Sequence, residues 1–216
     1  MMRRAIFLDR DGTLVERRHY PRHPEELCLY PGIGPLLRTA QQAGFALVVV
    51  TNQSGIAHGY FTMADLAAMH AGLAHALAAW DVRLDGIYVC PHHPDGIIAP
   101  FAISCTCRKP APGLLLQAAE DLNLTLNHSW MIGDILADIE AGKRVGCRTI
   151  LVDLDTEPLP VSWIQSPDYV ARSTVHALQV VLAVEGLGPC VELDYWPVRW
   201  TRTPSANSER PMDDGM

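Results

Sequence analysis

The sequence lacks any apolar run long enough to cross a membrane. Its longest runs, such as residues 45–50 and 180–184, fall far below the ~18 residues that a spanning helix needs. The run that follows Arg3 and Arg4 covers only residues 5–8, which is too short for the core of a signal peptide. We therefore expect a protein that has no membrane partner and is located in the cytoplasm.

The sequence also lacks an excess of positive charge and any internal repeat. A formal net charge of -7 and 49% hydrophobic residues describe a mildly acidic globular protein and argue against a nucleic-acid partner. A length of 216 residues predicts one domain with an extension. We expect the domain over residues 1–186 and the extension over 187–216, with a disordered end. We expect a monomer, and the extension offers a route to a dimer.

The apolar pattern predicts an α/β protein. Helical patterns, one of them opened by the capping box Thr62 and Asp65, separate short runs rich in β-branched residues. The expected strands are residues 5–8, 45–50, 86–89, 130–132 and 149–152, and the expected helices are 33–42, 62–80, 113–122 and 137–145. This alternation is typical of a doubly wound, mainly parallel Rossmann-like sheet with helices on both faces. Ligands bind such sheets beyond the carboxyl ends of the strands.

Carboxylates follow two of the predicted strands. Asp9 and Asp11 come after the first strand, and side chains two apart on a strand point the same way. Such a pair needs a cation or a shared proton, although Asp and Gly are also common in plain turns. Asp134 follows the fourth strand and can complete an oxygen-rich Mg²⁺ site with Asp9 and the backbone carbonyl of Asp11. Asp138, one helical turn on, fits a supporting role outside the coordination shell.

Two further segments can hold anionic oxygens. Thr51, Asn52, Gln53 and Ser54 follow the second strand and offer hydroxyl, amide and backbone N–H groups. The pair 108–109, Arg then Lys, comes shortly before a predicted helix, and the N-terminal end of a helix favours phosphate. Taken alone, an ordinary polar loop explains the first segment, and a solvated surface pair is the simpler explanation of the second.

Three of the six cysteines lie close together in residues 90–107. Cys90 and His92, followed by Cys105 and Cys107, make a closed set of four ligands of the structural Zn²⁺ kind, with His93 as a competing ligand. A closed site leaves no position for substrate, so we expect zinc to order this loop. The alternative is a set of buried thiols beside a chance histidine.

The four strand-end segments together resemble those of the haloacid dehalogenase superfamily of phosphatases. The resemblance implies that Asp9 is the nucleophile that forms an aspartyl-phosphate and that Asp11 is the general acid and base. It also implies that Thr51 and Lys109 stabilise the transferring phosphoryl group. The residues expected around the substrate are Gly12, Thr13, Arg17, His19, Tyr20, Asn52, Gln53, Ser54 and Arg108.

Together with the zinc loop, residues 5–152 resemble the heptose bisphosphate phosphatase group, whose members lack a large cap domain. This implies Mg²⁺-dependent removal of the 7-phosphate from a small phosphorylated sugar. The alternatives are a histidinol-phosphate phosphatase and a non-catalytic, zinc-stabilised module that binds a phosphorylated ligand. Ile135 departs from the group, which typically carries Lys there, and the segment beyond Gly186 has no counterpart.

Overall fold

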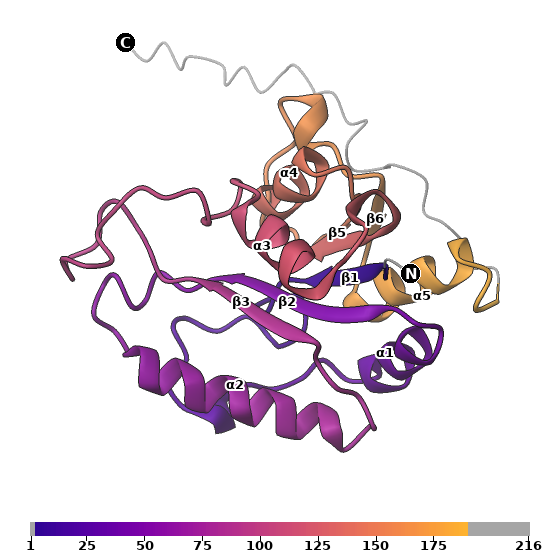
Figure 1. The fold of residues 1–216 in the computed structure, drawn as a ribbon, viewed down its shortest axis with the longest axis horizontal. Helices are drawn as coiled ribbons and strands as arrows, with labels where there is room; N and C mark the ends of the chain where they lie inside the picture. The colour runs from indigo at the N-terminus through magenta and orange to yellow at the C-terminus, as the bar shows by residue number, and fades with distance from the viewer. Residues whose placement is uncertain (1–2, 190–216) are drawn as a thin grey trace, which may run out of the picture.

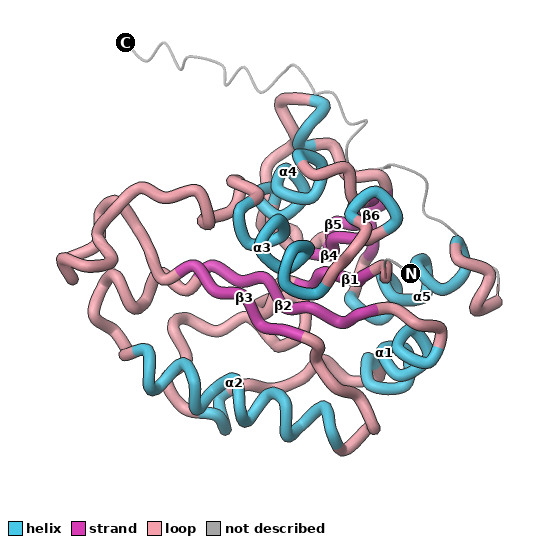
Figure 2. Tube along the Cα trace, viewed as in Figure 1, coloured by secondary structure: helices cyan, strands magenta, loops and turns pink. Residues whose placement is uncertain are grey.

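The computed structural model describes residues 3–189, which form a single parallel sheet between two layers of helices (Figure 1, Figure 2). The sheet order is β3-β2-β1-β4-β5-β6. The strands are β1 (Ala5–Leu8), β2 (Ala46–Asn52), β3 (Gly86–Cys90), β4 (Trp130–Gly133), β5 (Arg148–Val152) and β6 (Tyr169–Ala171). The strand order reverses between β1 and β4, so the carboxyl ends of these two strands define the switch point where such sheets bind ligands.

Strand β1 lies at the centre of the sheet and all four of its residues are buried. Ile6 pairs with Leu47 of β2 on one side and with Trp130 of β4 on the other. Burial on both faces explains why this strand is apolar throughout instead of alternating. The backbone N–H of Asp9 donates to the carbonyl of Ile132 at 3.0 Å, which fixes the first residue after β1 beside β4.

Helices cover both faces of the sheet (Figure 2). They are α1 (Ile33–Gln42), α2 (Met63–Ala78), α3 (Gly113–Leu122), α4 (Leu136–Arg144) and α5 (Thr174–Val184). Ile6 and Leu8 of β1 point into the core shared with α1, α5 and the end of α2. Phe7, between them, points into the opposite core beneath α3 and α4. The alternation of a strand therefore supplies both cores at once.

The predicted doubly wound α/β fold is confirmed, with no large cap domain among the described residues. The capping box is present, since Thr62 Oγ1 accepts from the N–H of Asp65 and Asp65 accepts from the N–H of Thr62. The sequence did not predict β6, α5 or the short 3-10 helices Pro24–Glu26, Leu126–His128 and Trp163–Gln165. Nearly all of the extension, residues 190–216, lies outside the described residues.

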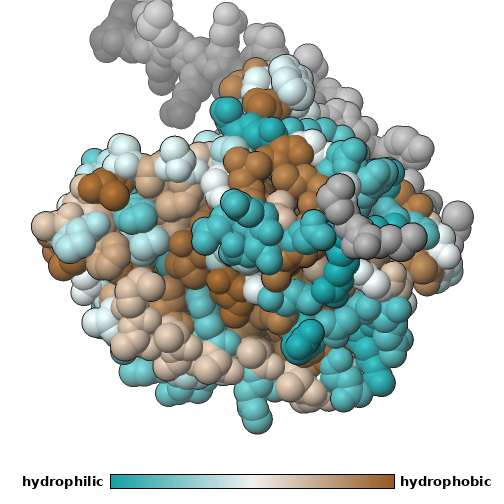
Figure 3. Space-filling model, viewed as in Figure 1, coloured by the Kyte–Doolittle hydropathy of each residue, from teal (hydrophilic) through white to brown (hydrophobic). Residues whose placement is uncertain are grey.

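The surface shown in Figure 3 mixes hydrophilic and hydrophobic residues. The most exposed large hydrophobic side chains of the described part include Ile97, in the loop between β3 and α3, and Val161 and Trp163, just before and at the start of the 3-10 helix Trp163–Gln165. Within residues 3–189, none of the helices combines the length and the apolar character of a membrane span.

Candidate active site

A cleft of about 420 Å³ lies at the carboxyl ends of β1, β2 and β4. The lining includes the charged residues predicted for the chemistry, among them Asp9, Lys109 and Asp134. The others are Arg10, Asp11, Arg17, Arg18, His19, Tyr20, Pro21, Asn52, Gln53, Ser54 and Ile135. Segments that are far apart in the sequence therefore meet at the switch point of the sheet.

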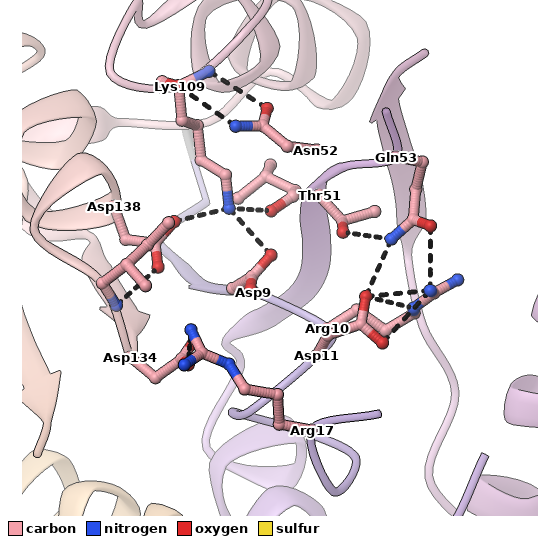
Figure 4. A network of polar contacts seen from close by, with 12 residues as sticks. Asp9, Arg10, Asp11, Arg17, Thr51, Asn52, Gln53, Lys109, Asp134 and Asp138 are labelled. Carbon is pink, nitrogen blue, oxygen red and sulfur yellow. Dashed lines mark hydrogen bonds and ion pairs between the residues drawn. The ribbon is translucent and has the colours of Figure 1, made fainter. Parts of the chain in front are cut away.

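Lys109 is buried between two carboxylates (Figure 4). Its Nζ lies 2.8 Å from Asp9 Oδ1, 2.5 Å from Asp138 Oδ1 and 2.8 Å from the carbonyl oxygen of Val50. Burial alone disfavours the charged ammonium, but the two carboxylates outweigh it and raise the pKa of Lys109. The amine is therefore a fixed positive charge beside Asp9.

The main chain of Lys109 is held by Asn52, at the end of β2. Asn52 Nδ2 donates to the carbonyl of Lys109 and Asn52 Oδ1 accepts from its N–H, each at 3.1 Å. This paired contact fastens the segment after the cysteine cluster to the sheet. Asn52 therefore sets the position from which Lys109 reaches Asp9.

Asp134 is almost fully buried, yet neither of its oxygens accepts a hydrogen bond from any described residue. Its one close charge partner in that part of the chain is Arg17, whose Nη2 lies 3.0 Å from Oδ2 in an ion pair. Carboxylate oxygens of Asp9, Asp134 and Asp138 all lie within 4.8 Å of one another. Opposite ligands of Mg²⁺ are about 4.2 Å apart, so this cluster has the size and the donor chemistry of a magnesium site.

Burial and the neighbouring carboxylates raise the pKa values of Asp134 and Asp138. Burial, followed by repulsion from Asp9 and Asp138, raises the pKa of Asp134 to about 8. Burial also raises the pKa of Asp138 to about 6, although Lys109 opposes the shift. Because Asp138 already pairs with Lys109 and accepts from the N–H of Ile135, it fits the supporting position, while Asp9 and Asp134 have oxygens free for a cation.

Asp11 points away from this cluster and into a second polar network (Figure 4). Its Oδ2 accepts from Arg10 Nη2 and from Gln53 Nε2, each at 2.8 Å. Gln53 Nε2 also donates to Thr51 Oγ1 at 2.9 Å, and Gln53 Oε1 accepts from Arg10. Asp9 and Asp11 therefore line one cleft with different partners, one a lysine and the other an arginine with an amide.

The remaining predicted substrate residues divide into two groups. Arg17, His19 and Tyr20 line the cleft on the loop between β1 and α1. Thr13 is fully buried away from the cleft, with its carbonyl bound to Thr174 Oγ1. Arg108 is also outside the lining, because its Nη1 donates to the carbonyl of His92 at 3.3 Å.

The cysteine cluster gathers Cys90, at the end of β3, with His92, Cys105 and Cys107. The sulfurs of Cys105 and Cys107 lie 3.2 Å apart, and His92 Nδ1 lies 3.3 Å from the Cys107 sulfur. A tetrahedral zinc site has edges of about 3.8 Å, close to these separations. His93, the competing ligand, instead accepts from the N–H of Asp95.

Sequence reasoning gave no role to Arg10, which is fully buried and binds both Asp11 and Gln53. The signal was present, because Arg10 comes directly after a fully buried apolar strand and lies between two carboxylates in the sequence. A charge buried in this way needs partners. His70 is a further neighbour, with Nε2 lying 3.4 Å from Arg10 Nη1.

Comparisons with known proteins agree with this site. A family model described as HAD-hydrolase-like matches residues 106–177. D-glycero-beta-D-manno-heptose-1,7-bisphosphate 7-phosphatase of Yersinia pestis is 41% identical over 169 residues, which cover 78% of this chain and 90% of the relative. The enzyme of the same name from Escherichia coli K12 is 40% identical over 177 residues, which cover 82% of this chain and 93% of the relative.

Solved structures show the same relationship. A HAD-like phosphatase of Mesorhizobium loti superposes with a TM-score of 0.75 at 36% identity and covers 88% of this chain and 90% of its own. The D,D-heptose 1,7-bisphosphate phosphatase of B. bronchiseptica, complexed with magnesium and phosphate, gives 0.70 at 30% identity and covers 85% of this chain and 99% of its own. The chain therefore belongs to the heptose bisphosphate phosphatase family of the haloacid dehalogenase superfamily, and it is a phosphatase.

Proposed function

We propose that the protein removes the 7-phosphate from D-glycero-β-D-manno-heptose 1,7-bisphosphate. The observation that carries this proposal is the buried Lys109 beside Asp9, within a carboxylate cluster that also holds Asp134. Asp9 would supply the nucleophile, Lys109 the fixed positive charge and the carboxylate cluster the cation site, all at the switch point of the sheet. The names of the relatives supply the sugar and its β anomer.

In the first step, a carboxylate oxygen of Asp9 attacks the phosphorus of the 7-phosphate. The bond between Asp9 and phosphorus forms, the bond from phosphorus to the sugar oxygen breaks, and Asp11 gives its proton to that oxygen. In the second step, a water molecule gives a proton to Asp11 and attacks the phosphorus, which releases inorganic phosphate and restores Asp9. Lys109 neutralises charge on the phosphoryl oxygens in both steps.

Asp9 and Asp134 would hold Mg²⁺, with the backbone carbonyl of Asp11 as the further expected ligand. When bound, Mg²⁺ offsets the carboxylate charges and polarises the phosphoryl group. Zn²⁺ fits the four ligands of the cysteine cluster, where it would order residues 90–107 and so support the main chain of Lys109. These two metals have separate roles, because only the carboxylate cluster opens into the cleft.

The cleft has cationic groups for a second phosphate. Two arginines, Arg17 and Arg18, lie on its wall in the loop between β1 and α1, and His19 follows them. A substrate with phosphates at both ends can place one at Asp9 and the other against this loop, which favours a bisphosphate over histidinol phosphate. The protein would act as a cytoplasmic monomer with its catalytic domain over residues 1–186.

Phosphate release tests the proposal. The purified protein, loaded with Mg²⁺ and Zn²⁺, is given the β and α anomers of D-glycero-D-manno-heptose 1,7-bisphosphate and, separately, histidinol phosphate. We expect the highest kcat/KM with the β anomer and heptose 1-phosphate as the sugar product. A preference for histidinol phosphate would show that the proposed substrate is wrong. No turnover of any of the three compounds would overturn the proposal.

A further inference from the structure

A row of aromatic rings connects the wall of the cleft to the cysteine cluster. The ring of His19 contacts Tyr20 with centroids 4.6 Å apart, and Tyr20 contacts Tyr60 at 4.5 Å. Tyr60 then contacts His58 at 5.7 Å, and His58 contacts His93 at 4.9 Å. The row begins with two residues that line the cleft and ends directly after the cluster residue His92.

Tyr20 needs this support, because its backbone has φ +48°. Residues with a Cβ atom avoid this left-handed conformation unless their surroundings hold them in it. The ring of Tyr20 packs on Tyr60 with the planes 55° apart, and it also fits closely against Gly55. A Cβ atom on Gly55 would lie 2.9 Å from Tyr20 Cδ1 and 2.3 Å from Phe61 Cε1, so glycine is required for this packing.

The segment that carries Tyr60 is itself fastened to the loop between β3 and α3. The N–H groups of Ile97 and Ile98 both donate to the carbonyl of Ala57, at 2.8 and 3.0 Å. Both segments extend from the carboxyl ends of adjacent strands, β2 and β3 (Figure 1). Tyr60 is therefore held from one side while its ring holds Tyr20 on the other.

We propose that Tyr60 is a positioning residue for substrate specificity, since its ring holds Tyr20 and His19 on the wall that receives the part of the substrate beyond the reacting phosphate. Tyr60 lies outside the cleft lining and is 42% exposed, so it acts through Tyr20 and not by contact with the substrate. This inference rests on the proposed function for its substrate. It requires the ring of Tyr60 but not the hydroxyl.

The kinetic test compares Tyr60→Ala with Tyr60→Phe and with Trp163→Ala, an exposed aromatic residue outside the row. Loss of one aromatic pair predicts a KM for the heptose bisphosphate roughly 3- to 10-fold higher in Tyr60→Ala, with kcat changed less than about twofold. Tyr60→Phe and Trp163→Ala should match the parent protein. Turnover of p-nitrophenyl phosphate, which has no sugar or second phosphate, should be the same in all four proteins.

A second measurement does not depend on the substrate. Hydrogen exchange of the peptide covering residues 17–23 should be faster in Tyr60→Ala and unchanged in Tyr60→Phe. Unchanged exchange in Tyr60→Ala, or equal effects of Phe and Ala, would overturn the inference. A kcat for p-nitrophenyl phosphate that falls as far as that for the sugar would do the same.

These readouts separate two failures. If the parent protein hydrolyses p-nitrophenyl phosphate but not the heptose bisphosphate, the proposed function fails, and the exchange measurement alone decides the role of Tyr60. Melting temperatures show whether each variant is folded. Tyr60→Leu replaces Tyr60→Ala if the smaller residue prevents folding.

Discussion

Gly12 and Asp134 lie so close together that the glycine cannot be replaced without moving the carboxylate. A Cβ atom on Gly12 would lie 2.2 Å from Asp134 Oδ2, and the glycine has φ +85°. The turn after β1 therefore needs glycine for its conformation and for the space that it leaves to the carboxylate after β4.

We expect Gly12→Ala to displace Asp134 and to lower kcat/KM by roughly 100-fold or more, since small displacements of catalytic groups have effects of this size. Gly44→Ala is the matched control, because Gly44 has φ +92° and nothing within 4 Å of an added Cβ. Gly44→Ala should lower the free energy of unfolding by about 1 to 2 kcal/mol through backbone strain and should leave activity unchanged. Phosphate release and the Mg²⁺-induced rise in melting temperature measure both variants; equal behaviour would contradict the close contact.

Asp9→Asn should lower kcat by roughly 10³-fold or more, while the protein stays folded. The amide is no nucleophile, but it keeps the size of the side chain, and its loss of charge reduces repulsion toward Asp134. Asp95→Asn changes a highly exposed carboxylate outside the cleft and should keep full activity. Normal turnover by Asp9→Asn would rule out the aspartyl-phosphate mechanism.

The contribution of Asp134 to stability without Mg²⁺ should become less favourable as the pH rises from about 4 to about 8. The pKa of Asp134 is raised from 3.8 to about 8, so in this window the folded protein binds more protons than the unfolded chain. Asp134→Asn should reduce the slope, and added Mg²⁺ should restore stability at the upper end. Melting curves at several pH values test this, in buffers freed of Mg²⁺ without a chelator that would remove zinc. An unchanged dependence of stability on pH in Asp134→Asn would contradict the raised pKa of Asp134.

A second pH effect has the opposite sign. Burial, with a smaller contribution from Arg10, lowers the pKa of His70 from 6.5 to about 4. At this position the unfolded chain therefore binds more protons between these values, and the contribution of His70 to stability should become less favourable as the pH drops through this window. His70→Gln should flatten that part of the curve and His128→Gln, at an exposed position, should not. Chemical denaturation at several pH values compares the two.

Cys107→Ser should lose the metal of the cysteine cluster, since its sulfur lies 3.2 to 3.3 Å from two of the other donor atoms. Loss of the metal should loosen residues 90–107 and lower kcat, because Lys109 follows this loop directly. Cys28→Ser, in the loop between β1 and α1, should keep one zinc ion per chain by native mass spectrometry. Full zinc content in Cys107→Ser would show that the ligand set is wrong.

The strand ends that carry Asp9, Asn52 and Asp134 could be predicted, because short apolar runs followed by polar groups are visible in the sequence. β6 could not, since Tyr169–Ala171 is only three residues long and half-buried. α5 is apolar on most of its surface and so has no clear helical period in its sequence, although it buries seven residues.

Parts of the site depended on contacts between distant segments. The resemblance to the phosphatase superfamily implied that Lys109 acts together with Asp9, but nothing in the sequence indicated that it would also pair with Asp138. The ring contact of Tyr20 with Tyr60 is of the same kind, because it joins two loops and no periodic pattern records it. Spacing predicts which residues share a face, and only the tertiary structure decides which of them touch.

The position of β1 has a consequence for synthesis on the ribosome. β1 comes first in the chain but lies at the centre of the sheet, and its partner β4 begins only at Trp130. Until about residue 133 has left the exit tunnel, one edge of this fully apolar strand has no native neighbour, although β2 is already available on the other. We therefore expect the nascent chain to expose an apolar strand edge until β4 has been synthesised, and unpaired strand edges of this kind favour aggregation during folding.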